Sequence, residues 1–153
     1  MKTEMNKVPI GMANSEWLVR TVLAALREGQ IANAVNQFGE QFAFNDYGIG
    51  LEFRDKGHLT DFFRKTRELY PDASLHTNRI LVSGDDVVAK WTLRTRVTEP
   101  FYGGLSRKVP SSLHGASIVR MANGKITAWA DYYDGLTARR TALASYFTEW
   151  IEL

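Results

Sequence analysis

Two aspartates alternate with aromatic side chains in this chain, and acids in such a setting can transfer protons. Asp131 lies in the segment AWADYY, with Trp129 and Tyr133 two residues away on either side. Asp46 ends the segment QFAFND, two residues after Phe44. Residues at this spacing share one face of a β-strand. We therefore expect each carboxylate among buried aromatic rings, where lost solvation raises its pKa toward neutrality and suits it to acid–base work.

Two interpretations of these acids are open. Two buried carboxylates on opposite walls of a pocket can divide the work, one ionised as a base and the other protonated as an acid. Alternatively, each acid bonds a tyrosine hydroxyl, a tryptophan N–H or backbone amides near a strand end and does no chemistry. We take Asp131 and Asp46 as the candidate catalytic residues.

The composition bounds the class of protein. The chain has 153 residues, with 44% hydrophobic and 24% charged residues, which suits one globular domain with a sizeable core. A net charge of +2 is too balanced to predict nucleic-acid binding. There is no cysteine, no run of about 20 apolar residues that predicts a membrane span, and no secretory signal pattern near the start. We expect a soluble, cytoplasmic protein with no membrane partner.

Proline, glycine and helix-capping residues predict where the helices, strands and loops of the chain begin and end. Residues 1–13 are polar and contain Pro9 and Gly11, so we expect a flexible N-terminal arm there and a single domain over residues 14–153. Asn14 or Ser15 can cap a first helix, and Gly29 ends it. Further helices are predicted from Ile31 to about Phe38, from His58 to Leu69 and from about Thr137 to Glu149. Strands are predicted over 41–46, 74–83, 86–98 and both arms of a later hairpin, with loops over 47–57 and 101–106.

The hairpin has the strongest local signal. Asn123 and Gly124 both tolerate positive φ, which a type I′ turn requires, and alternating segments flank them. The order of the elements then predicts an α+β fold, in which a cone-shaped, curved antiparallel sheet packs against N-terminal helices and a C-terminal helix. Bent strands under helices leave a conical cavity, a common place for a small-molecule site.

Two segments carry a family resemblance. The helix start FRDKGHLTDFFRKT and the closing NGKITAWADYYD, together with the element order, resemble the nuclear transport factor 2-like superfamily, especially its SnoaL-like branch, over about residues 14 to 150. This superfamily includes ketosteroid isomerase, polyketide cyclases, limonene epoxide hydrolase and proteins without catalysis. The resemblance implies a cone with an apolar pocket whose chemistry depends on a few lining positions.

The resemblance also places family residues on this chain. The general base of ketosteroid isomerase falls on Asp46, and its oxyanion pair falls approximately on Val22 and Ser117, whose hydroxyl can donate one hydrogen bond. Polyketide cyclases of this type use a pocket aspartate helped by a histidine, and Asp131 or Asp46 fits the acid. By parity, His114 shares the outward face of its strand and does not fit the histidine.

The epoxide hydrolase pattern is matched in part. One acid of its Asp-Arg-Asp group matches Asp131, while the arginine and the second aspartate fall on Trp91 and Leu93. Its asparagine aligns with Asn45 or Asp46. From the resemblance and the alternation together, the candidate substrate-binding residues are Asn45, Tyr47, Trp91, Leu93, Ser117, Trp129 and Tyr133.

These residues favour a small-molecule isomerase, cyclase or hydrolase that transfers a proton on an apolar or carbonyl-bearing substrate without a cofactor. The alternative is a non-catalytic member that binds a hydrophobic ligand or serves as a dimeric scaffold. His58, His76 and His114 stand on separate elements without metal-ligand spacing, so we expect no metal. No dinucleotide, P-loop or nucleophile-elbow motif is present in the sequence.

A basic face suggests how the chain associates. Lys90, Arg94 and Arg96 alternate with apolar residues, so they lie on the outer side of their strand. Members of the resembled family often dimerise through the outside of the sheet. We therefore expect a homodimer through this outer face, with solvated charge as the alternative.

Overall fold

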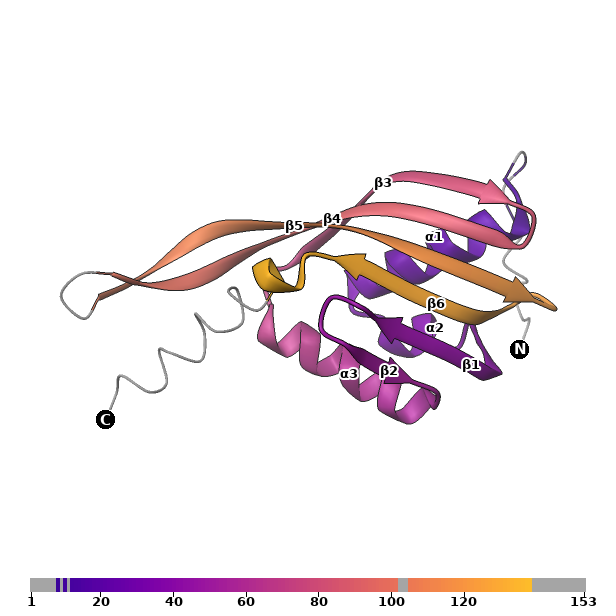
Figure 1. The fold of residues 1–153 in the computed structure, drawn as a ribbon, viewed down its shortest axis with the longest axis horizontal. Helices are drawn as coiled ribbons and strands as arrows, with labels where there is room; N and C mark the ends of the chain where they lie inside the picture. Colours follow the sequence, from indigo (N-terminus) through magenta and orange to yellow (C-terminus); the bar gives the residue numbers. More distant parts are fainter. Residues whose placement is uncertain (1–7, 9, 11, 102–104, 139–153) are drawn as a thin grey trace, which may run out of the picture.

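The structure is a computed structural model that describes residues 8, 10, 12–101 and 105–138. Its elements follow the predicted order of two helices, a strand, a helix and a run of strands, with one unexpected short strand before the third helix (Figure 1). They are α1 (Asn14–Glu28), α2 (Ile31–Val35), β1 (Phe38–Asp46), β2 (Leu51–Phe53), α3 (Lys56–Leu69), β3 (Ser74–Ser83), β4 (Asp86–Phe101), β5 (Leu105–Ala122) and β6 (Lys125–Tyr133). Residues 135–138 begin a further helical turn.

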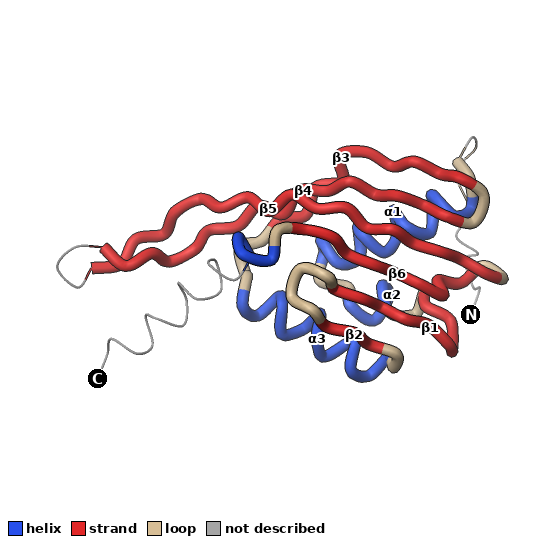
Figure 2. The backbone as a smooth tube through the Cα atoms, viewed as in Figure 1, coloured by secondary structure: helices blue, strands red, loops and turns tan. Residues whose placement is uncertain are grey.

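The six strands form one curved sheet in the order β2-β1-β6-β5-β4-β3, with the helices gathered on one side of it (Figure 2). Every neighbouring pair is antiparallel except β1 and β6, which run in the same direction. The α+β architecture is confirmed, and the parallel pair is an addition to the expected antiparallel sheet. The β6 strand pairs with β5 along one edge, as the two arms of a hairpin, and with β1 along its other edge.

Helix ends follow from local chemistry. Gly29 takes φ 75°, and the last carbonyls of α1 accept hydrogen bonds from the backbone beyond the helix, as in a left-handed cap. The predicted cap at Asn14 or Ser15 is wrong, because Ala13 holds the cap position without a side-chain bond. The third helix begins at Lys56, two residues earlier than expected, where the Asp55 side chain accepts a hydrogen bond from the His58 amide.

Strand boundaries differ from the expectation in three places. The second helix ends at Val35, because Phe38 is already the first, fully buried residue of β1. The segment expected as a loop over 47–57 contains β2, which pairs with the end of β1. The pairing of β4 with β5 continues to Phe101 and Leu105, so the two strands extend beyond their neighbours as a two-stranded arm (Figure 1).

The turn between β5 and β6 is as predicted. Asn123 has φ 53° and Gly124 has φ 72°, the two positive values that a type I′ turn needs. The expected N-terminal arm and the closing helix beyond Ala138 lie almost entirely outside the described residues.

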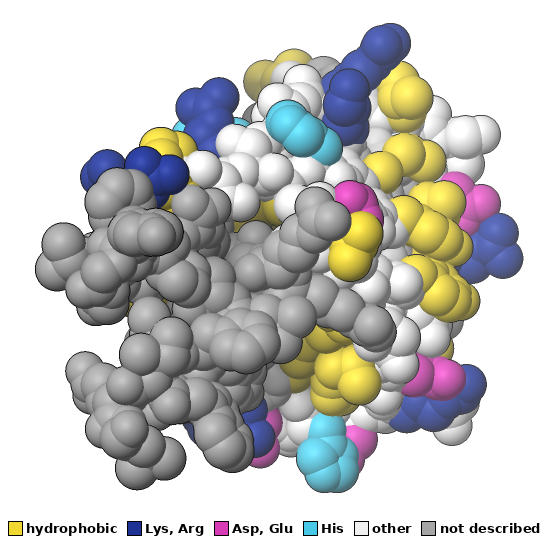
Figure 3. Space-filling model, turned by 60° about the vertical axis from the view of Figure 1, so that its left-hand side comes forward, with side chains coloured by type: hydrophobic (Ala, Val, Ile, Leu, Met, Phe, Trp, Pro, Cys, Tyr) yellow, Lys and Arg dark blue, Asp and Glu magenta, His cyan; other side chains and the backbone are white. Residues whose placement is uncertain are grey.

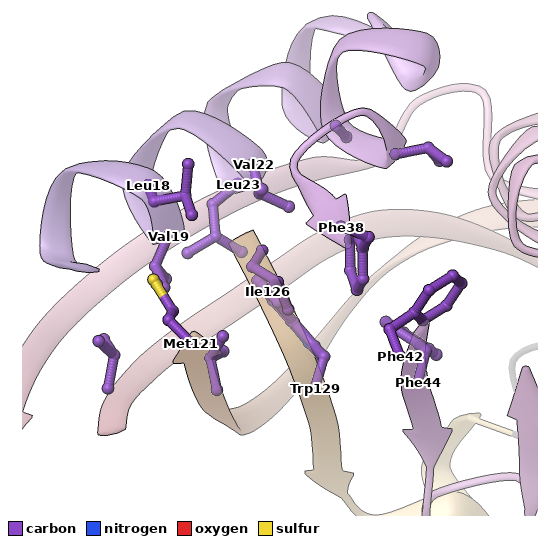
Figure 4. Close-up of a cluster of buried hydrophobic side chains, with 14 of the residues drawn as sticks. Leu18, Val19, Val22, Leu23, Phe38, Phe42, Phe44, Met121, Ile126 and Trp129 are labelled. Atoms are coloured by element: carbon purple, nitrogen blue, oxygen red, sulfur yellow. The ribbon is translucent and has the colours of Figure 1, made fainter. Parts of the chain in front are cut away.

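The main core lies between α1 and the inner face of the sheet (Figure 4). Apolar residues at helical spacing on α1 form one buried cluster with inward residues of β1, β4, β5 and β6. The helix approaches the sheet most closely at β3 and β4. Phe44 is at the centre of an aromatic cluster: its ring stacks on Trp129 at an interplanar angle of 18° and meets Phe63 edge-on. The labelled members are Leu18, Val19, Val22, Leu23, Phe38, Phe42, Phe44, Met121, Ile126 and Trp129.

Candidate active site

A cavity of about 480 Å³ lies beyond this core, between the inner face of the sheet and the ends of α1 and α3. Most of its wall is apolar, and its acidic lining residues are Asp46 and Asp131. Further lining residues include Arg27, Phe44, Leu51, Lys65, Arg67, Leu69, Trp91, Leu93, Thr95, Ser111, Leu113, Ser117, Trp129 and Tyr133.

Asp131 is held on one of its two oxygens. Its Oδ1 accepts a hydrogen bond from the Ser117 hydroxyl at 2.5 Å and another from the Trp129 indole N–H at 2.7 Å. Its Oδ2 has no hydrogen-bond partner among the described residues. The carboxyl is therefore oriented by the protein through one oxygen while the other stays available for a ligand.

Ser117 is itself positioned by a second indole. The Trp91 N–H donates a hydrogen bond to the Ser117 oxygen at 2.9 Å, and the Ser117 hydroxyl donates its own hydrogen bond to Asp131. Trp91 reaches this position because Gly115, its direct partner on β5, has no side chain, and a Cβ there would overlap the indole ring. The result is a buried chain of donors that runs from Trp91 through Ser117 to Asp131.

The pKa of Asp131 is strongly perturbed. The pKa is raised from the ordinary aspartate value of 3.8 to about 7, chiefly because burial in apolar surroundings disfavours the charged form. Within this net shift of the pKa, the hydrogen bonds from Ser117 and Trp129 act to lower it and the nearby charge of Asp46 acts to raise it. A carboxyl with this pKa exchanges protons readily near neutral pH.

Asp46 is buried at 5% exposure and is committed to the turn that follows β1. Its Oδ1 accepts a hydrogen bond from the Ile49 amide at 3.1 Å, and its backbone oxygen accepts one from Gly50. Burial raises the pKa of Tyr133, and so does the hydrogen bond that this tyrosine makes with Asp46. Asp46 thus anchors both a turn and an aromatic wall of the cavity.

The two acids are neighbours on one wall. Asp46 and Asp131 are direct partners in the parallel pairing of β1 with β6. The expectation that they stand on opposite walls is therefore wrong. Sequence patterning placed both on an inward face but did not reveal which strand lies beside which.

Five of the predicted substrate-binding residues line the cavity, namely Trp91, Leu93, Ser117, Trp129 and Tyr133. The other two do not. Tyr47 is 58% exposed and stacks on Tyr132 with ring centroids 4.9 Å apart, on the outer side of the sheet. Asn45 alternates with Phe44 and Asp46, so it too faces away from the cavity.

Three positions that sequence reasoning missed also shape the site. Gly115 leaves room for the Trp91 ring, and Gly48 leaves room for the ring of Tyr133. Thr95 lines the cavity, and its Oγ1 is buried without a hydrogen-bond partner among the described residues. The alternation of Thr95 with Trp91 and Leu93 was visible in the sequence, but the two glycine contacts are long-range and leave no local signal.

The histidines lie away from the cavity. His114 is exposed on the outer face, as predicted, where its Nδ1 lies 3.1 Å from the Thr92 hydroxyl. Within the described residues, no cluster of three or more His, Asp or Glu side chains has the arrangement of a metal site. No described helix is long and apolar enough to span a membrane.

The curved sheet, the helices over its inner face and the acid-lined cavity define the cone-shaped α+β class of the nuclear transport factor 2-like superfamily. Within this class the chain belongs to the SnoaL-like domain family, whose family model matches residues 19–129. No curated protein shows significant sequence similarity to the chain.

Solved structures agree on the fold. A putative SnoaL-like polyketide cyclase from Shewanella putrefaciens superposes with a TM-score of 0.70 at 13% identity, covering 87% of this chain and 88% of its own. IdmH, a putative polyketide cyclase from Streptomyces antibioticus, gives 0.70 at 16% identity, covering 84% and 98%. TerC, co-crystallised with polyporic acid, gives 0.69 at 15% identity, covering 86% and 99%. At these identities the likeness shows the fold alone.

Proposed function

We propose that the protein is a small-molecule enzyme of the isomerase or cyclase type, in which Asp131 transfers a proton on a carbonyl-bearing ligand inside the cavity. The observation that carries this proposal is the state of the Asp131 carboxyl. It lies in an apolar cavity, has a pKa of about 7, and is gripped through Oδ1 so that Oδ2 can meet a ligand.

The chemistry follows from that carboxyl. Ionised Asp131 accepts a proton from the carbon next to a ligand carbonyl, and the C–H electron pair forms an enolate. In an isomerisation the protonated Asp131 returns the proton to another carbon. In a ring closure the enolate carbon attacks a second carbonyl of the same ligand, and Asp131 protonates the resulting alkoxide. General acid–base catalysis of this kind contributes about 10²- to 10⁴-fold.

Asp46 has a different part in this proposal. Its hydrogen bond from the Ile49 amide and its place beside Asp131 in the pairing of β1 with β6 make it a positioning residue for the wall next to Asp131. Its negative charge, on the strand beside Asp131, also helps to raise the pKa of the proton-transferring acid. We therefore assign proton transfer to Asp131 and orientation to Asp46.

An isomerase or cyclase is favoured over an epoxide hydrolase. The hydrolase resemblance needs an arginine and a second acid at the positions of Trp91 and Leu93, and both residues present apolar surface to the cavity. The similarity of the fold to SnoaL-like polyketide cyclases supports the same choice. The complex of TerC with polyporic acid supports a cavity that takes a small organic molecule.

A test needs no knowledge of the natural substrate. A panel of enolisable aryl ketones and diketones is incubated with the protein in deuterated buffer, and deuterium incorporation next to the carbonyl is followed by mass spectrometry. We expect catalysed exchange that Asp131→Asn reduces by about 10²-fold or more. Asp61→Asn, on the exposed surface of α3, is the matched control and leaves the rate unchanged. Exchange that survives Asp131→Asn would remove this residue from the mechanism.

One observation favours a second function, ligand binding without catalysis. The protein's own donors, Ser117 and Trp129, satisfy the Oδ1 of Asp131, as they would in a purely structural carboxyl. A protein that binds members of the panel tightly and yet leaves their exchange rates at the uncatalysed level would be a carrier of this kind.

We further propose that a second copy of the chain covers the outer face of the sheet. Ile118, Tyr132 and Tyr47 are exposed there, at 45%, 45% and 58%. Ala116, Ala128 and Ala130 lie among them by register. Hydrophobic side chains gather on the right-hand part of the view in Figure 3, while basic ones stand around the edge. An apolar centre with a charged rim is typical of a protein–protein interface.

A further inference from the structure

Among the described residues, the charged side chains on the exposed part of the cavity wall are all basic. Five lining residues are exposed and so mark the mouth: Arg27, Leu51, Lys65, Arg67 and Leu69. Three of them are cations, and none of the five is an anion; Arg27 also forms an exposed ion pair with Glu28 at 3.4 Å. The two leucines, at 43% and 51% exposure, supply apolar surface between the charges.

These cations come together because two helices end at the same place. Arg27 lies in the last turn of α1, and Arg67 lies in the last turn of α3. The Arg67 guanidinium packs directly over Gly29, where a Cβ would overlap it. Lys65 lies on α3 two residues before Arg67 and lines the same cavity.

The inner part of the cavity has the opposite character. Asp46 and Asp131 are the acidic lining residues, on neighbouring strands, and Asp46 is buried while Asp131 is partly buried. A cavity with cations at the mouth and acids at the floor orients a polar ligand, because each end repels groups of its own sign.

A third observation points to a polar group on the ligand. Thr95 and its direct partner Ser111 on β5 both line the cavity. Along the two paired strands, Leu93 and Leu113 separate them from Ser117. The Thr95 Oγ1 is buried without a hydrogen-bond partner among the described residues. Buried hydroxyls are normally paired, so a donor left open in a cavity wall is suited to a ligand oxygen.

We infer that the cavity selects an elongated ligand with an apolar body and an anionic group, such as a carboxylate, that stays at the mouth among Arg27, Lys65 and Arg67. The apolar body fills the wall between Leu93 and Trp129, and the opposite end reaches Asp131. That the inner end bears a reacting carbonyl rests on the proposed function, whereas the preference for an anionic group does not.

The helix ends suggest a competing explanation. Basic residues near helix C-termini stabilise the negative end of the helix dipole, and Arg27 and Arg67 are both so placed. Lys65 lies outside the last turn of α3, and a dipole role predicts no effect of these residues on ligand choice. A binding experiment with matched ligands therefore separates the two explanations.

The experiment uses two fluorescent probes with the same aromatic body. Anilinonaphthalene sulfonate carries one negative charge, and N-phenylnaphthylamine is its neutral counterpart. Titration of the full chain with each probe yields two dissociation constants and their ratio. We expect the charged probe to be preferred in the wild type, with a preference that weakens as salt is added. The triple variant Arg27→Gln/Lys65→Gln/Arg67→Gln should lose about tenfold in that ratio, because three exposed ion pairs each contribute little.

Binding of the neutral probe reports whether the cavity is intact. The affinity for the neutral probe should be unchanged in the triple variant. The single variant Lys65→Glu changes an exposed position and should lower the preference for the charged probe. The control Lys90→Gln/Arg94→Gln removes cations from the outer face of the sheet and should leave the ratio as it is. An equal ratio in wild type, triple variant and Lys65→Glu would overturn the inference. Because deuterium exchange is measured separately, loss of exchange in a protein that keeps the anion preference would refute only the proposed reaction.

Discussion

Ser117 and Asp131 are direct partners across β5 and β6, and the serine hydroxyl donates its hydrogen bond to the aspartate Oδ1. The serine oxygen in turn accepts the Trp91 N–H, and the same Oδ1 accepts the Trp129 N–H. The acid at the centre of the candidate site is thus held by three strands of the sheet.

The Asp131 carboxyl should titrate near neutrality. In a sample with ¹³C-labelled aspartate, its NMR signal should move with a midpoint of about 7, and Asp131→Asn should remove that signal. A midpoint in the ordinary range near 3.8 would show that the carboxyl is well solvated, and the acid–base proposal would lose its main support.

The same pKa predicts how stability changes with pH. The folded-state pKa is raised above the ordinary value, so the folded protein holds the proton that the unfolded chain has released between pH 3.8 and about 7. Stability from this group is complete below that window and is lost as the pH rises through it. The difference corresponds to roughly 4 kcal/mol in the free energy of unfolding. Urea unfolding at several pH values should show this loss in the wild type and lack it in Asp131→Asn.

Removing the serine hydroxyl should shift the titration upward. The hydrogen bond from Ser117 lowers the pKa of Asp131, so Ser117→Ala should move the NMR midpoint above the wild-type value of about 7. Ser112→Ala, an exposed position on the same strand, is the matched control and should leave the midpoint unchanged. A lower midpoint in Ser117→Ala would mean that the hydroxyl acts in some way other than by donating to the carboxylate.

Gly115→Ala should displace Trp91. The added methyl group overlaps the indole ring, so the ring must move and its hydrogen bond to Ser117 must break or lengthen. Overpacking of this kind costs typically about 1–3 kcal/mol. Gly39→Ala, where the nearest atom to an added Cβ is 3.5 Å away, is the control. Chemical unfolding and the tryptophan emission spectrum together measure the effect, and equal stability of the two variants would contradict it.

The proposed dimer depends on apolar contact through the outer face of the sheet. Ile118→Asp buries a charge in that interface and should convert a dimer to a monomer in light scattering after size exclusion. Ile118→Val keeps an apolar side chain and should remain dimeric. A wild-type protein that is monomeric at high concentration would refute the dimer directly.

Much of the fold was accessible from local patterns. The alternation in AWADYY placed Trp129, Asp131 and Tyr133 on one face, and all three line the cavity. The Asn123-Gly124 turn and the ends of β3 were predicted as they stand. The short strand β2 was missed, because its three residues lie between glycines and become a strand only by pairing with β1.

The sequence by itself determined which residues turn inward, since side-chain direction along a strand follows from backbone geometry over a few residues. Tertiary structure alone decided which inward residues meet. The parallel pairing of β1 with β6 made Asp46 the neighbour of Asp131, and the space above Gly115 brought Trp91 to Ser117. The meeting of two helix ends placed Arg27 and Arg67 at one mouth. These contacts join residues far apart in the chain, and they arise because burial of the whole apolar surface selects the strand order and register.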